Sequence, residues 1–229
     1  MMKLILFLVI VAAVVGGVLY VVSGDQRGPI GDPVLSATPV EATATPLVFS
    51  DGVYQLTASA SRMEWSGSKT LIANYIDRGT VAIASGSAVV EGGAVTKGSV
   101  VVDLTTITTT STGRGSGETM MQKHLKSADF FDVEKYPTAA FTFEKLTPAS
   151  VSGQLTVSGT LAIKGVTKPV QFLATLTGAG NALTMEATAT LDRTQWGLTY
   201  ASGNFFKNLG DKVIDDLFTV HFVVVGTRR

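Results

Sequence analysis

The sequence predicts an all-β fold, with one antiparallel barrel or sandwich of about eight strands in residues 47–229. Apolar and polar residues alternate with a period of two over several short stretches, which is typical of strands that bury one face. Glycine-rich turn sequences separate these stretches. Strands and helices do not alternate at the spacing of βαβ units, which argues against a doubly wound sheet.

The first 22 residues predict a membrane anchor or a signal segment. Residues 4–22 carry no charge, and as a helix they would span about 28 Å, close to the ~30 Å hydrocarbon core of a bilayer. This run is longer than the apolar core of a usual signal peptide and lacks a clear A-x-A cleavage site, so an uncleaved anchor is favoured over a cleaved signal. Because Lys3 favours a cytoplasmic N-terminus, we expect a periplasmic or other extracytoplasmic domain anchored to the cytoplasmic membrane by the N-terminal helix.

Residues 23–46 predict a linker between this segment and the barrel. They contain Pro29, Pro33, Pro39 and Pro46 among Gly, Ser, Thr and Ala, and they show neither alternation nor a helical period. Such a segment cannot bury enough apolar area to offset the entropy lost on ordering. We therefore expect the folded domain to occupy residues 47–229.

The expected strands follow in order. Val81, Ile83, Val100 and Val102 show a weak alternation. The alternation is clear in residues 141–143, 155–163, 183–191 and 218–224, and turn sequences occupy residues 77–79, 91–93, 165–169 and 178–181.

The sequence predicts one or two short helices. Residues 118–127 place Met120, Met121 and either His124 or Leu125 at helical spacing, and residues 211–217 could form a further short turn. Phe130 and Phe131 follow the first of these segments, and they could close one end of a barrel.

The inward faces of the expected strands are apolar, and alternation alone leaves two alternatives open. These residues can fill a core, or they can line a cavity for one apolar ligand, since eight-stranded barrels do both. The candidates for a cavity wall are Trp65, Val81, Ile83, Phe141, Phe143, Leu155, Val157, Leu161, Met185, Val220 and Phe222. The candidates for contact with a polar lipid head are Arg62, Lys69 and His124.

Several functional classes lack support in the sequence. Equal numbers of basic and acidic residues, 18 of each, argue against a nucleic-acid-binding protein. The chain has no cysteine, and its two histidines form no H-x-x-x-H pattern, so we expect no metal and no cofactor. No G-x-S-x-G sequence occurs, residues 113–117 lack the Lys-Ser/Thr ending of a P-loop, and Asp211, Asp215 and Asp216 lack the spacing of a calcium loop. We therefore expect no enzymatic activity.

Three longer sequences resemble the YceI-like family. They are HLKSADFFDVEKYPTAAF at 124–141, GTLAIKGVTKPV at 159–170 and DRTQWG at 192–197, together with the shorter WSGSK at 65–69, GTV at 79–81 and VDL at 102–104. The resemblance covers roughly residues 52–225. It implies an extended, lipocalin-like antiparallel barrel that holds a polyisoprenoid or similar long-chain amphiphile, in a family that is often exported to the periplasm and is not established as enzymatic.

Together these observations predict an exported, membrane-tethered protein that sequesters or carries a long-chain lipid inside its barrel. Its expected partners are that lipid and, through the N-terminal segment, the membrane; nucleic acid is not expected. One alternative is a fully packed structural or interaction domain without a ligand. A second alternative, an enzyme of isoprenoid metabolism, lacks a nucleophile constellation or a metal motif in the sequence.

Overall fold

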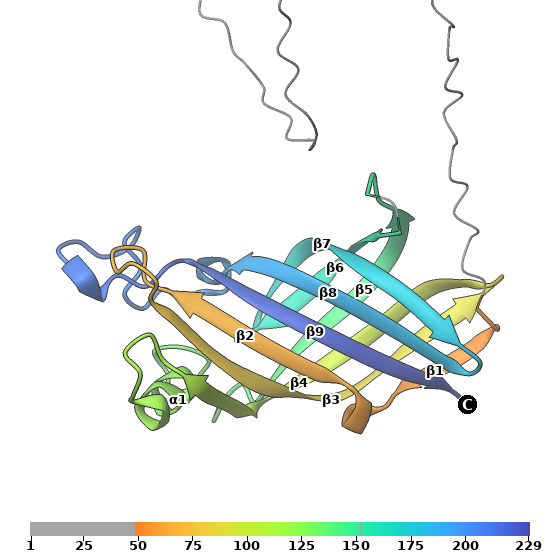
Figure 1. The fold of residues 1–229 in the computed structure, drawn as a ribbon, viewed down its shortest axis with the longest axis horizontal. Coiled ribbons are helices and arrows are strands. Elements are labelled where there is room, and N and C mark those ends of the chain that lie inside the picture. The colour runs from red at the N-terminus through yellow and green to blue at the C-terminus, as the bar shows by residue number, and fades with distance from the viewer. Residues whose placement is uncertain (1–48, 152) are drawn as a thin grey trace, which may run out of the picture. The chain divides into compact units, whose positions relative to one another are not determined.

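The computed structural model describes residues 49–151 and 153–229, so the predicted anchor and linker lie outside the described residues. Nine antiparallel strands form one sheet (Figure 1). They are β1 (Gly52–Leu56), β2 (Arg62–Ser68), β3 (Ile76–Glu91), β4 (Ala94–Ser111), β5 (Thr138–Pro148), β6 (Leu155–Ile163), β7 (Val166–Ala179), β8 (Ala182–Asp192) and β9 (Leu217–Arg228).

The sheet closes into a barrel because β4, at one end of the strand order, also pairs with β3, the second strand from the other end. The short strands β1 and β2 share one position between β3 and β9. β2 pairs with the first part of β3, and β1 pairs with its last part, where Gly52 lies opposite Val90. Nine strands therefore fill eight positions around the ring, which confirms the predicted barrel of about eight strands and excludes the sandwich.

The longest strands curve around the barrel. β3 and β4 have 16 and 18 residues, and the register between them shifts at four places, including Thr80/Ala82 and Ile83/Ser85. Such irregularities bend and twist a strand, which helps a sheet to close. In β3 the buried positions still alternate from Asp77 to Ile83, but two of the four are Asp77 and Gly79, which explains why the sequence signal there is weak.

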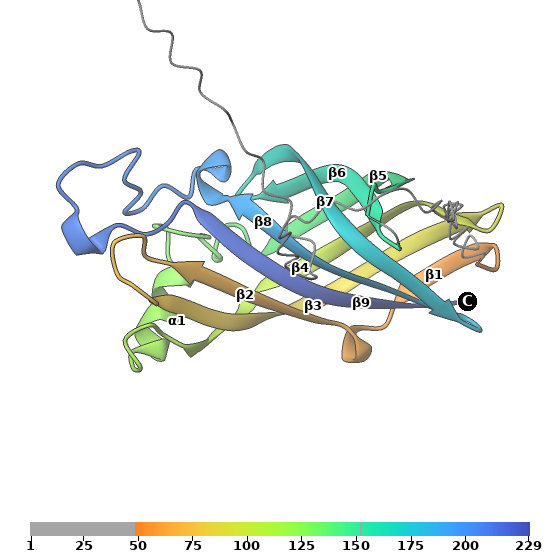
Figure 2. The same cartoon turned by 45° about the horizontal axis from the view of Figure 1, so that its top comes forward.

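The two ends of the barrel differ. One end, here called the turn end, carries the tight connections between β3 and β4 and between β7 and β8. The other, the loop end, carries the helix α1 (Glu118–Lys126), the 3₁₀ helices η2 (Arg193–Trp196) and η3 (Gly210–Lys212), and the loop between β2 and β3 (Figures 1 and 2). The short 3₁₀ helix η1 (Ala58–Ala60) separates β1 from β2. The prediction of a short helix at 118–127 is confirmed within one residue.

The apolar core forms two clusters along the barrel. The turn-end cluster contains Tyr54, Phe143 and Val157, and the loop-end cluster contains Ile107, Phe130 and Trp196. Within residues 49–151 and 153–229, the helices are all too short or too polar to span a bilayer.

Candidate ligand cavity in the barrel

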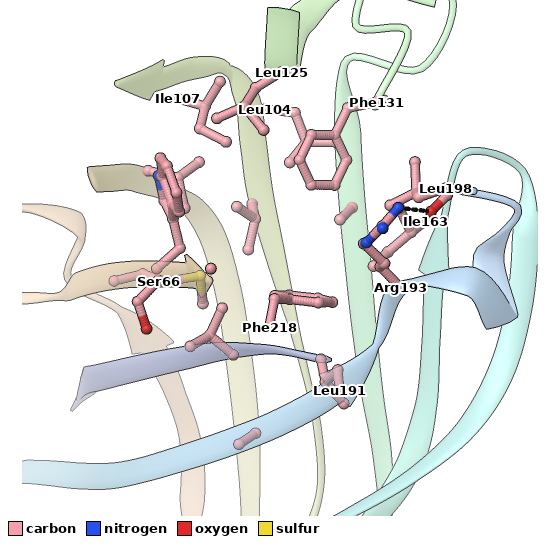
Figure 3. Close-up of a pocket in the computed structure, with 18 of the residues that line it drawn as sticks. Ser66, Leu104, Ile107, Leu125, Phe131, Ile163, Leu191, Arg193, Leu198 and Phe218 are labelled. Atoms are coloured by element: carbon pink, nitrogen blue, oxygen red, sulfur yellow. Dashed lines mark hydrogen bonds between the residues drawn. The ribbon is translucent and has the colours of Figure 1, made fainter. Parts of the chain in front are cut away.

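An apolar cavity of about 200 Å³ lies inside the loop-end half of the barrel. This volume is more than ten times the roughly 10–15 Å³ that a single buried water requires. Every strand from β2 to β9 contributes at least one side chain to the wall, and Figure 3 shows Phe131, Leu198 and Phe218 around the same space. The alternative of a fully packed interior therefore does not hold for this half of the barrel.

Strand alternation builds most of the wall. In β9, Phe218, Val220, Phe222 and Val224 line the cavity, while His221 between them lies outside and contacts Glu186 at 3.0 Å. The pleat of a strand sends successive side chains to opposite faces. The predicted period of two thus becomes an apolar inner surface, whereas the other face of β9 carries Thr219 and His221 beside the buried Val223.

Trp65 is fixed in the wall by a hydrogen bond and by a glycine. Its indole N–H donates to the carbonyl oxygen of Thr108 at 3.1 Å. The ring lies against Gly79, where an added Cβ would approach Nε1 to 2.6 Å and the Thr108 oxygen to 1.8 Å. Only glycine therefore permits this position of the indole, which leaves the apolar ring toward the cavity.

The segment after α1 covers part of the loop end. Phe131 N–H donates to Leu125 O at 3.1 Å, and Asp132 N–H donates to Ser127 O at 2.8 Å, which folds the chain back on the helix. Leu125, Phe130 and Phe131 all line the cavity as a result. This is the position at the barrel end that the sequence predicted for the two phenylalanines.

Arg193 is the only arginine or lysine among the residues that line the cavity, and sequence reasoning did not select it. Arg193 is 4% exposed, and its guanidinium donates to the carbonyl oxygens of Leu198 (Figure 3), Tyr200, Ile214 and Asp215. It also forms an ion pair with Asp216 at 3.2 Å. Burial lowers the pKa of the guanidinium, and the nearby carboxylates of Asp216, Asp192 and Asp215 act in the opposite direction.

These contacts give Arg193 a structural role. The acceptor residues belong to the long segment between η2 and β9, so one guanidinium holds both ends of that segment against the barrel. Asp216 extends the network, because its other oxygen accepts from Ser202 at 2.9 Å and from Asn204 at 2.7 Å. Of the three aspartates that the sequence could not assign, Asp216 is thus explained by an ion pair.

Asp77 is the second charged residue in the wall with a perturbed pKa. Burial raises the pKa of its carboxyl, and a hydrogen bond from the Gly113 N–H at 3.0 Å partly counteracts this effect. The neighbouring Tyr75 is also buried, and its pKa is raised by burial and by the charge of Asp77. Together with Ser66, Ser68 and Asp215, Asp77 makes one edge of the cavity polar.

A second cavity of about 60 Å³ lies toward the turn end. The two cavities share Val100, Phe141, Phe172, Phe222 and Val224 in their walls. The ring centroids of Phe141 and Phe172 are 5.4 Å apart, and those of Phe172 and Phe222 are 5.6 Å apart. These three rings, here called the phenylalanine partition, lie between the two cavities.

The structure places the predicted wall residues in three groups. Six line the larger cavity, namely Trp65, Val81, Phe141, Leu161, Val220 and Phe222. Phe143 and Met185 line the smaller one. Ile83, Leu155 and Val157 are buried or half-buried but belong to neither wall.

The predicted headgroup residues lie outside both walls. Arg62 is exposed on β2. Lys69 follows β2, donates to Asp211 O at 3.4 Å and has its Nζ 5.1 Å from the centre of the Tyr75 ring. His124 lies on α1, 3.4 Å from the Asp129 carboxylate and edge-on to Tyr200. Their contact with a lipid head stays a prediction.

Sequence reasoning missed several wall residues, including Met63, Phe172, Leu191 and Phe218. Leu191 and Phe218 lie in stretches whose alternation was recognised, so the period itself could have found them. Phe172 precedes the exposed Leu173, and two adjacent apolar residues leave the inward one undetermined. In residues 49–151 and 153–229, no three His, Cys, Asp or Glu side chains gather as a metal site would require.

Comparisons with known proteins all point to one family, that of the YceI-like domains. The sequence profile of the YceI-like domain matches residues 54–225. The protein YceI of Escherichia coli O6:H1 is 40% identical over 79 residues, which cover 34% of this chain and 40% of that protein. A UPF0312 protein of Pseudomonas putida W619 is 42% identical over 84 residues, which cover 33% of this chain and 42% of that protein. The matches thus span about two fifths of the length of these relatives.

Two solved structures share the fold. BcnA of Burkholderia cenocepacia superposes with a TM-score of 0.59 at 18% identity, over 75% of this chain and 99% of that one. A polyisoprenoid binding domain from Saccharophagus degradans, implicated in plant cell wall breakdown, superposes with a TM-score of 0.58 at 17% identity, over 79% of this chain and 100% of that one.

Proposed function

Because the chain belongs to the family of YceI-like domains, we propose that its barrel binds one long-chain amphiphile and shields the apolar tail from water. The observation that carries this proposal is the apolar cavity of about 200 Å³ inside the barrel. The related fold from Saccharophagus degradans is a polyisoprenoid binding domain, which makes a prenyl chain the first class to test.

The binding energy would come from removal of the tail from water. Apolar surface contributes roughly 25 cal/mol for each Å² that is buried, so a tail that buries several hundred Å² gains several kcal/mol before the entropy of binding is subtracted. The wall residues Trp65, Leu161, Phe141 and Val220 supply apolar contact. The proposal contains no catalytic step, since Asp77, Arg193 and Asp215 in the wall are engaged in hydrogen bonds of the fold.

The polar head would stay at the loop end. Ser66, Ser68, Asp77 and Asp215 form the polar edge of the cavity there, and the Ser68 hydroxyl donates to Asp215 at 3.1 Å. Lys69 follows this edge directly in the sequence. Among the three predicted headgroup residues, we favour Lys69 for this reason.

We further propose that residues 4–22 anchor the chain in the cytoplasmic membrane and that residues 23–46 connect the anchor to an extracytoplasmic barrel. The uncharged run and the proline-rich sequence support this proposal. A linker of this length would keep the barrel close to lipids of its own membrane.

The test is lipid content measured on the full chain and on matched variants. Native mass spectrometry of the purified protein, followed by organic extraction, identifies any bound lipid, and added polyprenol tests uptake. Ala189→Phe and Ala139→Phe each place a ring inside the cavity, from β8 and from β5, two strands that β6 and β7 separate in the sheet. Thr188→Phe adds the same ring on the exposed outer face of β8 and serves as the control.

We expect the unmodified chain and Thr188→Phe to carry or take up lipid, and both cavity variants to lose most of it while remaining folded by circular dichroism. Folded cavity variants that take up as much polyprenol as the unmodified chain would contradict the proposal. An unmodified chain that is empty and takes up no polyprenol would contradict it as well.

A further inference from the structure

Large apolar side chains are exposed beside the cavity at the loop end. Leu71, in the loop between β2 and β3, is 64% exposed. Phe205 and Phe206, in the segment between η2 and η3, are 60% and 48% exposed. The two loops lie side by side in both views and are joined by a hydrogen bond from Asp215 N–H to Ser68 O at 2.9 Å (Figures 1 and 2).

The fold holds the aromatic pair in this exposed position. The N–H groups of Phe205 and Phe206 both donate to Ser202 O, at 3.2 and 3.0 Å. The Ser202 hydroxyl in turn donates to Asp216, which pairs with the buried Arg193. A buried ion pair therefore supports the base of a loop whose tip exposes two phenyl rings to solvent.

Lysines surround these apolar residues. The half-buried Lys69 and the exposed Lys207 and Lys212 lie on the two loops, together with the exposed Asp211 and the half-buried Asp215, so three positive charges face two negative charges. Asp215 and Asp216 are directed to Ser68 and Arg193. Because the Asp216 charge is balanced by Arg193, the segments carry a local excess of one positive charge, whereas the whole chain has a formal net charge of zero.

The same loops continue into the cavity wall. Ser68 precedes Lys69, Ile214 follows η3, and both line the cavity. Leu217, at the start of β9, lines the cavity and is 52% exposed, so the wall reaches the outer surface next to the aromatic loop. The exposed rings of Phe205 and Phe206 therefore lie next to the loop end of the cavity.

We propose that Leu71, Phe205 and Phe206, with Lys69, Lys207 and Lys212, form a docking surface for an anionic phospholipid membrane. Aromatic and aliphatic side chains flanked by lysines match the boundary between headgroups and acyl chains, where lysines meet the lipid phosphates. Docking brings the loop end of the cavity against the bilayer. The further statement that a lipid enters the barrel there rests on the proposed function.

The experiment uses the absence of cysteine from the chain, because one introduced thiol can be labelled uniquely. Leu71→Cys and Val151→Cys in the full chain each receive an environment-sensitive nitrobenzoxadiazole dye. Val151 is 50% exposed but lies in the connection between β5 and β6 at the turn end, so it provides a matched control. The vesicles contain spin-labelled lipid and either phosphatidylglycerol with phosphatidylcholine or phosphatidylcholine alone.

We expect a blue shift and strong quenching of the dye at residue 71 on the anionic vesicles, weaker quenching on neutral ones, and neither effect at residue 151. Phe205→Ser/Phe206→Ser in the Leu71→Cys background should abolish the quenching. Equal quenching at residues 71 and 151 would overturn the proposal, because the N-terminal segment alone would then account for vesicle binding. A spectrum that changes with protein concentration but not with vesicles would also overturn it and assign the surface to a second copy of the chain.

Lipid content, measured on the same samples, separates the two proposals. A labelled Leu71→Cys chain that keeps both phenylalanines and retains lipid, but shows no quenching on anionic vesicles, refutes the membrane surface alone. Retained docking by a chain that binds no lipid refutes the function of the cavity alone.

Discussion

Replacement of Arg193 by methionine tests how the loop end is held together. Methionine keeps much of the length and apolar volume of the side chain but removes every donor. Four backbone carbonyl oxygens and the Asp216 carboxylate then lose a partner at a site that is 4% exposed. Removal of one partner from a buried ion pair typically costs about 3–5 kcal/mol.

The expected loss lies near the lower end of that range. The Asp216 side chain is 16% exposed and keeps hydrogen bonds from Ser202 and Asn204, so its charge is not left entirely unsatisfied. We therefore expect Arg193→Met to lower the free energy of unfolding by about 3 kcal/mol. In a domain of this size, 1 kcal/mol corresponds to about 2–4 °C, so the melting temperature should fall by roughly 6–12 °C.

Urea unfolding followed by circular dichroism, with an unchanged m-value, measures this loss. Arg78→Met removes an exposed arginine from β3 and should change the free energy of unfolding by no more than about 0.5 kcal/mol. Arg193→Met/Asp216→Leu removes both charges and should recover part of the stability. A loss below about 1 kcal/mol in Arg193→Met would refute the reasoning, because the guanidinium would then contribute little beyond its packing.

Two further substitutions test the packing and the electrostatics of the interior. Gly98→Ala should lower the free energy of unfolding by about 1–3 kcal/mol, because the added Cβ would lie 2.3 Å from Cε1 of the buried Phe143 ring. Denaturant unfolding measures it, and Gly98→Ala/Phe143→Leu should lose less than the sum of the two single variants. Asp77→Asn should be more stable than the unmodified chain at neutral pH, because burial raises the pKa of the Asp77 carboxyl in the folded state. The unmodified chain should lose stability relative to this variant as pH rises through the interval between the unfolded and the raised folded pKa, since the folded state binds more protons there. Unfolding midpoints at a series of pH values measure this difference.

For both substitutions, one result would contradict the prediction. An unchanged stability of Gly98→Ala would mean that β4 and the Phe143 ring can separate without cost. A stability difference between Asp77→Asn and the unmodified chain that stays constant across the acid range would mean that the carboxyl titrates alike in both states.

Most strands of the barrel could be predicted from the sequence because alternation and turn residues are local signals. The alternation in residues 218–224 became the inward face of β9, and Thr138, directly after Pro137, became the first residue of β5. Val81, chosen from a weaker alternation, also lines the cavity wall. β3 was harder to recognise because two of its alternating buried positions, Asp77 and Gly79, are not apolar.

The network around Arg193 could not be predicted because it depends on residues that are distant in the chain. Asp216 lies 23 positions later, and the carbonyl acceptors come from both ends of an irregular segment. No local pattern marks an arginine whose partners converge only after folding. The proximity of Asp211, Asp215 and Asp216 was visible in the sequence, but nothing in their spacing indicated the buried cation.

The phenylalanine partition would make the free energy of binding depend on the length of the ligand's apolar tail. A short tail can stay in the larger compartment and leave the rings of Phe141, Phe172 and Phe222 in contact. Under the proposed function, a tail that continued to the turn end would pass between these rings, and separation of Phe172 from both neighbours would cost about 0.5–1.5 kcal/mol for each aromatic pair. The affinity of the barrel would therefore depend on the length of the bound tail, with a step where the tail reaches Phe172.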